Sequence, residues 1–111
     1  MRIAFTFRNL ESSEALKDYA SDKISKLQKY LRSPLEAEVI ASLERHLHCV
    51  DVTVSAAGKR YQGRSESEDM YASIDTVLDK IDRQVRREKA TRTAQRKRVS
   101  GGPAMLNGKG K

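Results

Sequence analysis

The side chains with the clearest arrangement for chemistry are cations on one predicted helix, Glu66 to Lys89 (ESEDMYASIDTVLDKIDRQVRREK). Its apolar side chains recur at spacings of three and four, so at about 100° per residue they share one face. One flank of that face holds Lys80, Arg83 and Arg87, and the other flank holds Asp75, Asp79 and Asp82. A solvated face more often mixes the signs in pairs four residues apart, as Asp79 and Arg83 still allow here. The sorted charges therefore favour an anionic partner for the basic flank.

Two other groups of residues invite comparison with chemical sites. His46, His48 and Cys49 are potential metal ligands, but two histidines one residue apart with a lone cysteine do not form a zinc pattern. The acidic run of Glu66, Glu68 and Asp69 is explained better by the positive end of a helix dipole than by catalytic carboxylates. The sequence has no Gly-rich phosphate loop and no nucleophile motif. We therefore expect no catalysis, no metal, no cofactor and no small-molecule substrate.

The charge of the chain is distributed unevenly. A chain of 111 residues fits one domain, and its net charge is +7. Residues 1–85 hold 13 basic and 14 acidic side chains, whereas residues 86–111 hold 9 basic and 1 acidic. This excess at the C-terminal end indicates a polyanion such as nucleic acid, or an anionic membrane surface. No run of 18 apolar residues occurs, the N-terminus alternates like a strand, and Cys49 is single, so we expect a cytoplasmic protein.

The first element that must position these cations is a strand followed by a helix. Ile3, Phe5 and Phe7 alternate with polar or small residues, which predicts a half-buried strand. Ser12 or Ser13 offers an N-cap for a helix that ends before Pro34. The apolar stripe of this helix recurs at spacings of three and four, with long side chains on its margin that can cover the core and keep their tips in water. The stripe residues are Leu16, Ala20, Ile24, Leu27 and Leu31, and the margin holds Tyr19, Lys23 and Tyr30.

Three strands fill the space between the two helices. Alternation predicts strands over 36–45 and 49–55. A hairpin turn follows at Ala57-Gly58-Lys59, where glycine supplies positive φ, and leads into a short fourth strand over 60–65. The order β-α-β-β-β-α predicts an α+β two-layer sandwich, with a four-stranded mixed sheet and both helices on one face. A right-handed crossover should place the first two strands parallel, and the last three should form a meander.

The apolar periodicity ends at about Thr91. We expect a folded domain over residues 1–90 and a basic tail over residues 91–111 that is disordered when free. The tail contains Arg92, Arg96, Lys97 and Arg98, which can form an arm ordered by RNA or can remain solvated. Lys59 and Arg60 at the predicted hairpin tip can contact phosphate, or they can serve only to keep the tip soluble.

Two segments of the chain resemble one known family. NLESSEALKDYASDKISKLQKY and ESEDMYASIDTVLDKIDRQ are similar to the two helical segments of the ribosome hibernation promoting factors. That family includes the ribosome-associated inhibitor A proteins, and its members were formerly called sigma-factor modulation proteins. The resemblance covers roughly residues 1–90 and is most specific at Asp69-Met70-Tyr71-Ala72.

The resemblance implies a fold related to double-stranded RNA-binding domains and a bacterial inhibitor of translation. Such a protein occupies the messenger and transfer RNA channel of the small ribosomal subunit and stabilises idle ribosomes in stationary phase or stress. Its partners would be ribosomal RNA, the whole ribosome and, for some short members, a separate ribosome modulation factor. The residues expected to face RNA are Lys23, Lys26, Lys29, Lys80, Arg83, Arg86, Arg87, Lys89 and Arg92.

Two features depart from the family pattern, and two other functions stay open. Phe7 stands where family members usually carry glycine, so its ring must join the core or lie exposed. Residues 91–111 are too few for the second domain that joins two ribosomes in long members, which indicates a short form.

A general double-stranded RNA-binding protein and a module that regulates a sigma factor are the alternatives. Tyr71 can stack on a base, but packing on the sheet or the first helix with a bonded hydroxyl is favoured.

Overall fold

The computed structural model describes the backbone of residues 1–101 and the side chains of residues 1–88. Its elements follow the predicted order, with one short 3-10 segment added after the first helix. They are β1 (Arg2–Arg8), α1 (Glu14–Ser25), η1 (Lys26–Tyr30), β2 (Glu36–Glu44), β3 (Leu47–Ala56), β4 (Lys59–Ser67) and α2 (Met70–Gly101).

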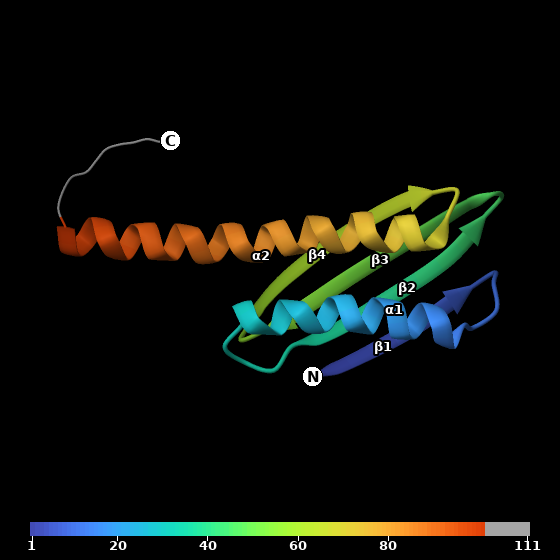
Figure 1. Cartoon of the computed structure of the whole chain (residues 1–111), viewed down its shortest axis with the longest axis horizontal. Coiled ribbons are helices and arrows are strands. Elements are labelled where there is room, and N and C mark those ends of the chain that lie inside the picture. The colour runs from blue at the N-terminus through green and yellow to red at the C-terminus, as the bar shows by residue number, and fades with distance from the viewer. Residues whose placement is uncertain (102–111) are drawn as a thin grey trace.

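One four-stranded sheet carries both helices on the same face (Figure 1). The strand order is β1-β2-β3-β4, with β1 and β2 parallel and the other two pairs antiparallel. The predicted mixed sheet, the parallel pairing of the first two strands and the meander are therefore confirmed. In Figure 1, α1 lies over the β1 side of the sheet and α2 over the β4 side, so the two helices run next to each other above it.

The turn between β3 and β4 has the geometry that the sequence predicts, with one addition. Ala56 pairs with Lys59, which leaves a two-residue loop of Ala57 and Gly58. Both loop residues have positive φ, 51° and 78°. Two successive positive φ angles match the right-handed twist of the strands. Glycine alone was expected to take this conformation, but Ala57 takes it too.

The core is mostly aliphatic and lies between the helices and the sheet. Ser13 caps α1, and its Oγ accepts the N–H of Leu16 at 3.2 Å. Phe7 is half-buried and packs against the core, where its ring stacks on Phe5 with centroids 6.4 Å apart. The bulky side chain in place of the usual glycine therefore joins the core. The buried apolar stripe of α2 consists of Met70, Ile74, Val77, Leu78, Ile81 and Val85.

The junction between β4 and α2 differs from the prediction. Glu66 was placed at the start of the helix, but it pairs with Cys49 in the sheet and α2 begins at Met70. The carboxylate at the helix start is that of Asp69, which accepts the N–H of Ala72 at 3.3 Å. The dipole explanation therefore applies to Asp69 and is wrong for Glu66, because strand pairing with β3 continues two residues beyond Ser65.

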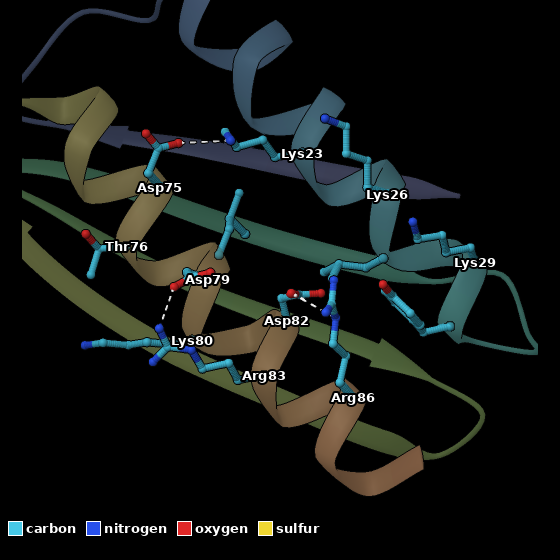
Figure 2. Close-up of a pocket in the computed structure, with 13 residues that line it drawn as sticks. Lys23, Lys26, Lys29, Asp75, Thr76, Asp79, Lys80, Asp82, Arg83 and Arg86 are labelled. Atoms are coloured by element: carbon cyan, nitrogen blue, oxygen red, sulfur yellow. Dashed lines mark hydrogen bonds and ion pairs between the residues drawn. The ribbon is translucent and has the colours of Figure 1, made fainter. Parts of the chain in front are cut away.

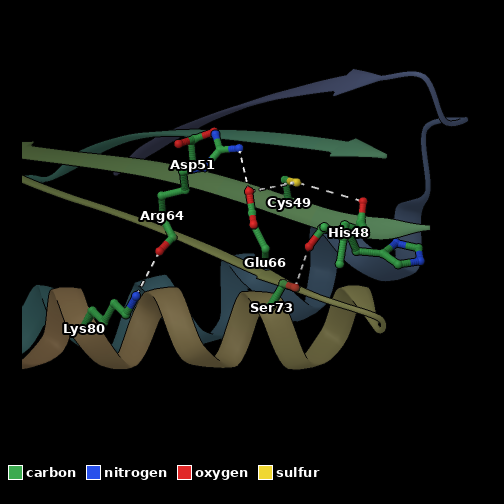
Figure 3. Close-up of polar contacts among 8 residues, drawn as sticks. His48, Cys49, Asp51, Arg64, Glu66, Ser73 and Lys80 are labelled. Carbon is green, nitrogen blue, oxygen red and sulfur yellow. Dashed lines mark hydrogen bonds and ion pairs between the residues drawn. The ribbon is translucent and has the colours of Figure 1, made fainter. Parts of the chain in front are cut away.

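Buried hydroxyl groups fix this junction to the sheet. Ser73 is fully buried, and its Oγ donates to the carbonyl oxygen of His48 on β3 at 2.7 Å (Figure 3). Ser65 in β4 donates to the carbonyl of Ser73 at 2.5 Å. These bonds satisfy polar groups that would otherwise be costly to bury, so they hold the first turn of α2 in one position.

The end of α2 also differs, because the helix runs to Gly101 and not to Lys89. In Figure 1 it continues beyond the sheet. The division of the chain at residue 90 and the disorder of the free tail stay predictions. The side chains of Lys89, Arg92, Arg96, Lys97 and Arg98, and all of residues 102–111, lie outside the described residues.

Candidate nucleic-acid interface

A groove of about 530 Å³ lies between the two helices. It forms because α1 with η1 and α2 pack on the same sheet face, so their outward-facing sides make its walls (Figure 2). Among the residues whose side chains are described, six cations and three carboxylates line it. The cations are Lys23, Lys26, Lys29, Lys80, Arg83 and Arg86, and the carboxylates are Asp75, Asp79 and Asp82.

The wall from α1 and η1 is basic. Lys23 forms an ion pair with Asp75 across the groove, with 3.2 Å between Nζ and Oδ1. Lys29 lies over the ring of Tyr30, with its Nζ 5.3 Å from the centroid. The side chain of Lys26 is exposed, and its ammonium has no hydrogen bond or ion pair within residues 1–88. Lys26 and Lys29 are therefore cations that no carboxylate of the described residues neutralises.

The wall from α2 presents the aspartate flank of the helix. Arg83 pairs with Asp79 at 2.9 Å and Arg86 pairs with Asp82 at 3.2 Å, both four residues apart. The guanidinium of Arg86 also lies 5.1 Å from the centroid of the Tyr30 ring. Pairs this exposed contribute little to stability, about 0.3–0.5 kcal/mol each. Their arginines remain available to exchange a carboxylate for a phosphate.

Lys80 and Gln84 interact with the free edge of the sheet. Lys80 Nζ donates to the carbonyl of Arg64 at 3.0 Å, and Gln84 Nε2 donates to the carbonyl of Gln62 at 2.7 Å. Figure 3 shows the Lys80 bond reaching from α2 to β4. Both carbonyls belong to the edge strand, so these bonds cover an edge that could otherwise pair with another strand. The ammonium charge of Lys80 is not neutralised by this bond.

The predicted interface residues are therefore brought together in part. Each groove carboxylate is paired with one cation, so the lining has a net positive charge carried by Lys26, Lys29 and Lys80. Arg87 is exposed and lies outside the lining. Lys59 at the hairpin tip pairs with Glu88 of α2 at 3.6 Å.

A latch between the helices is the feature that the sequence reasoning missed. Tyr19 on α1 donates its hydroxyl to Asp75 Oδ1 on α2 at 2.6 Å, the same oxygen that Lys23 binds. The hydrogen bond from Tyr19 and the charge of Lys23 lower the pKa of Asp75, against the opposing effect of burial. The hydrogen bond and charge of Asp75 raise the pKa of Lys23. The sequence signal that could have indicated this contact is the spacing of four between Tyr19 and Lys23, which puts both side chains on one side of α1.

Tyr71 adds an aromatic contact to this latch. Its ring meets that of Tyr19 edge to face, with centroids 4.9 Å apart and planes at 83°. Packing of Tyr71 on the first helix is thus confirmed. The predicted bond of its hydroxyl is not seen within the described residues, and the side chain is 39% exposed.

The possible metal ligands do not converge. His48 and Cys49 are adjacent in β3, so their side chains leave opposite faces of the sheet. Cys49 contacts Glu66, with 3.7 Å between Sγ and Oε2. Within the described residues, no three side chains of His, Cys, Asp or Glu are grouped to hold a metal ion. The described part of α2 and the other described helices also contain no segment long and apolar enough to cross a membrane.

Fold and groove together define a small α+β protein with a net positive, two-helix groove above one face of a mixed sheet. The chain belongs to the family described as Sigma 54 modulation protein / S30EA ribosomal protein, whose model matches residues 3–93. The predicted family is therefore confirmed.

Named relatives and solved structures agree with this membership. A ribosome hibernation promoting factor of Salmonella typhimurium is 34% identical over 89 residues, which cover 80% of this chain and 94% of the relative. The factor of the same name from Azotobacter vinelandii is 31% identical over 105 residues, which cover 93% of this chain and 98% of the relative. The N-terminal domain of Thermus thermophilus Protein Y superposes with a TM-score of 0.73 at 31% identity, covering 78% of this chain and 98% of that domain. A ribosomal subunit interface protein from Coxiella burnetii shares the fold, with a TM-score of 0.72 at 24% identity, covering 81% and 99%.

Proposed function

We propose that this protein is a ribosome hibernation factor that binds the small ribosomal subunit and blocks the channel for messenger and transfer RNA. The observation that carries the proposal is the net positive groove between α1 and α2 in a chain of this family. Relatives that share most of their length with this chain are named for ribosome hibernation. The role is steric and needs no catalysis.

Binding to the ribosome is mainly electrostatic and depends on the shape of the RNA. Lys26 and Lys29 on one wall, with Lys80 on the other, supply charge that no described carboxylate neutralises. Each phosphate that such a cation contacts releases condensed counterions, so the affinity falls as salt rises. Structured RNA is recognised through its backbone and shape more than through base sequence. The protein should therefore associate with ribosomes at physiological salt and compete with messenger RNA.

The test is co-sedimentation of full-length protein with small subunits on sucrose gradients. Lys26→Glu should reduce binding by about tenfold or more, because it removes a cation and adds a charge that repels phosphate. The matched control is Arg8→Glu, the same charge change on an exposed side chain of the face that the helices leave open.

Three outcomes would contradict the proposal. Absence of the wild-type protein from every ribosomal fraction would remove ribosome binding altogether. Equal loss of binding in both variants would indicate attraction by net charge alone, with no role for the groove. Short RNA duplexes that compete as well as ribosomes do would indicate a general double-stranded RNA-binding protein.

A further inference from the structure

Tyr71 is an exposed aromatic side chain in a protein whose core is mostly aliphatic. Met1 and Tyr71 are the large hydrophobic side chains exposed within the described residues, and Met1 is at the chain end. By contrast, Tyr61 is 5% exposed, and Tyr19 and Tyr30 are half-buried. The Tyr71 side chain is not needed to fill the core, because its neighbour Met70 occupies the buried position in this turn of α2.

The geometry of the tyrosine pair leaves ring surface open. The planes of Tyr19 and Tyr71 are nearly perpendicular, at 83°. In such a pair only an edge of one ring meets a face of the other, so at least one face of Tyr71 is not covered by Tyr19. An uncovered aromatic face can stack on any nucleobase, because every base has a flat π surface.

The ring is also held in place from both helices. Tyr19 donates to Asp75 at 2.6 Å, and Lys23 binds the same carboxylate while its Nζ lies 5.3 Å from the centre of the Tyr19 ring. Asp75 is four residues after Tyr71, so both lie on the same side of α2. The latch therefore orders Tyr19 against Tyr71 before any partner binds, which reduces the entropy lost on stacking.

The tyrosine pair continues the cationic groove. Lys23 and Asp75 belong both to the latch and to the groove lining, and Figure 2 shows them at one end of the groove. Lys26 follows on the same wall. A nucleotide whose base stacks on Tyr71 would thus have cations within reach of the adjacent phosphates.

We propose that Tyr71 stacks on an unpaired nucleobase of the RNA that the groove binds, with the Tyr19–Asp75–Lys23 latch holding the ring in position. This inference rests on the proposed function for the identity of the natural RNA. The stacking itself is a property of the tyrosine pair and can be measured without ribosomes. Stacking would fix the register of one strand, which phosphate contacts alone leave free to slide.

The first experiment is fluorescence of the full-length Tyr71→Trp variant with a single-stranded oligoribonucleotide. The chain has no tryptophan, so the new indole is the only one. An oligonucleotide with bases should quench its emission, and an abasic oligonucleotide of equal length and charge should not. Thr6→Trp, on the exposed side of β1, is the matched control and should show no difference between the two. Equal responses of Tyr71→Trp to both oligonucleotides would overturn the proposal.

The second experiment measures affinity for small subunits over a range of salt. Tyr71→Phe should bind like the wild type, whereas Tyr71→Leu should bind roughly 5- to 150-fold more weakly with an unchanged slope of log K against log salt. Lys29→Gln, which removes a groove cation that no described carboxylate neutralises, should instead reduce that slope by about one. Wild-type affinity for Tyr71→Leu would contradict stacking. Failure of the wild type to bind subunits would reject the proposed function, while quenching by the base-containing oligonucleotide would still support stacking.

Discussion

At the scale of single residues, Asp75 of α2 binds two side chains of α1. It accepts from Tyr19 and Lys23 of α1, and it follows Tyr71 by one turn of α2. The other two groove aspartates pair within their own helix, with Arg83 and Arg86. Asp75 is therefore the groove carboxylate whose partners come from the opposite wall, and its removal should affect how the helices hold each other.

We expect Asp75→Asn to lower the thermal midpoint at neutral pH, with a loss of at most about 1 kcal/mol because the carboxylate is half exposed. The lowered pKa of Asp75 means that its contribution is present above the unfolded value near pH 4 and is lost as pH falls through the folded value. The raised pKa of Lys23 means that its contribution is lost as pH rises through its folded value, above about pH 10. The difference between variant and wild type should thus shrink at both ends of a pH series of melting curves.

The control for this series is Asp18→Asn, an exposed aspartate of α1 whose side chain has no hydrogen bond or ion pair within residues 1–88. It should melt like the wild type throughout. A difference for Asp75→Asn that is constant across pH would show that the ionised carboxylate does not stabilise the latch.

At the scale of elements, the close approach of α2 to β4 depends on a glycine. A Cβ at Gly63 would lie 3.1 Å from Val77 Cγ2 and 3.5 Å from Ile81 Cγ1. The same strand offers Arg64 and Gln62 carbonyls to Lys80 and Gln84 at its free edge. Contact at the strand face and bonds at its edge together set the height and rotation of α2, and so the direction in which its charged flanks point.

We expect Gly63→Val to destabilise the protein by about 1–3 kcal/mol, because a Cβ and two methyl groups would be inserted into a space already filled by α2. Chemical denaturation measures this change. Gln62→Val, the same residue placed on the exposed side of the same strand, is the matched control and should change stability by less than about 0.5 kcal/mol. Equal effects of the two variants would indicate that strand propensity, not crowding under α2, controls the result.

At the scale of the whole molecule, charge is divided between the folded groove and the C-terminal segment. Ending the chain at Lys89 would remove 6 of the 22 basic side chains and no acidic ones. The remaining net charge would be close to neutral, so long-range attraction to a polyanion would weaken. The groove would still present its cations at short range.

We therefore expect a chain ending at Lys89 to associate with ribosomes more slowly, with a shallower dependence of affinity on salt. Association rates at two or more salt concentrations measure both effects. A full-length variant with glutamine at the basic positions of residues 90–111 separates charge from length and should behave like the truncated chain. An unchanged salt dependence in both proteins would show that this segment makes no contact with RNA.

Much of the fold could be predicted because local patterns determine it. Period-two alternation identified the first three strands, and the hairpin turn located the fourth. The apolar stripe of α2 matches the buried residues from Met70 to Val85. The β4–α2 boundary could not be predicted, since Glu66 and Ser67 suit a helix start in sequence but are held in the sheet by pairing with Cys49 and His48. Strand pairing is a non-local interaction, and local residue preferences do not report it.

The sequence by itself determined which side chains share a face, because helical and strand periods fix directions around each element. It therefore predicted a helix with basic and acidic flanks and the order of elements that builds a two-layer sandwich. Only the tertiary structure decided that the acidic flank faces α1, that Asp75 meets Tyr19 from 56 positions away, and that Lys80 reaches the edge of β4. The physical reason is that helical periodicity fixes directions only within one helix, whereas neighbours across a groove are set by how both helices pack on the sheet.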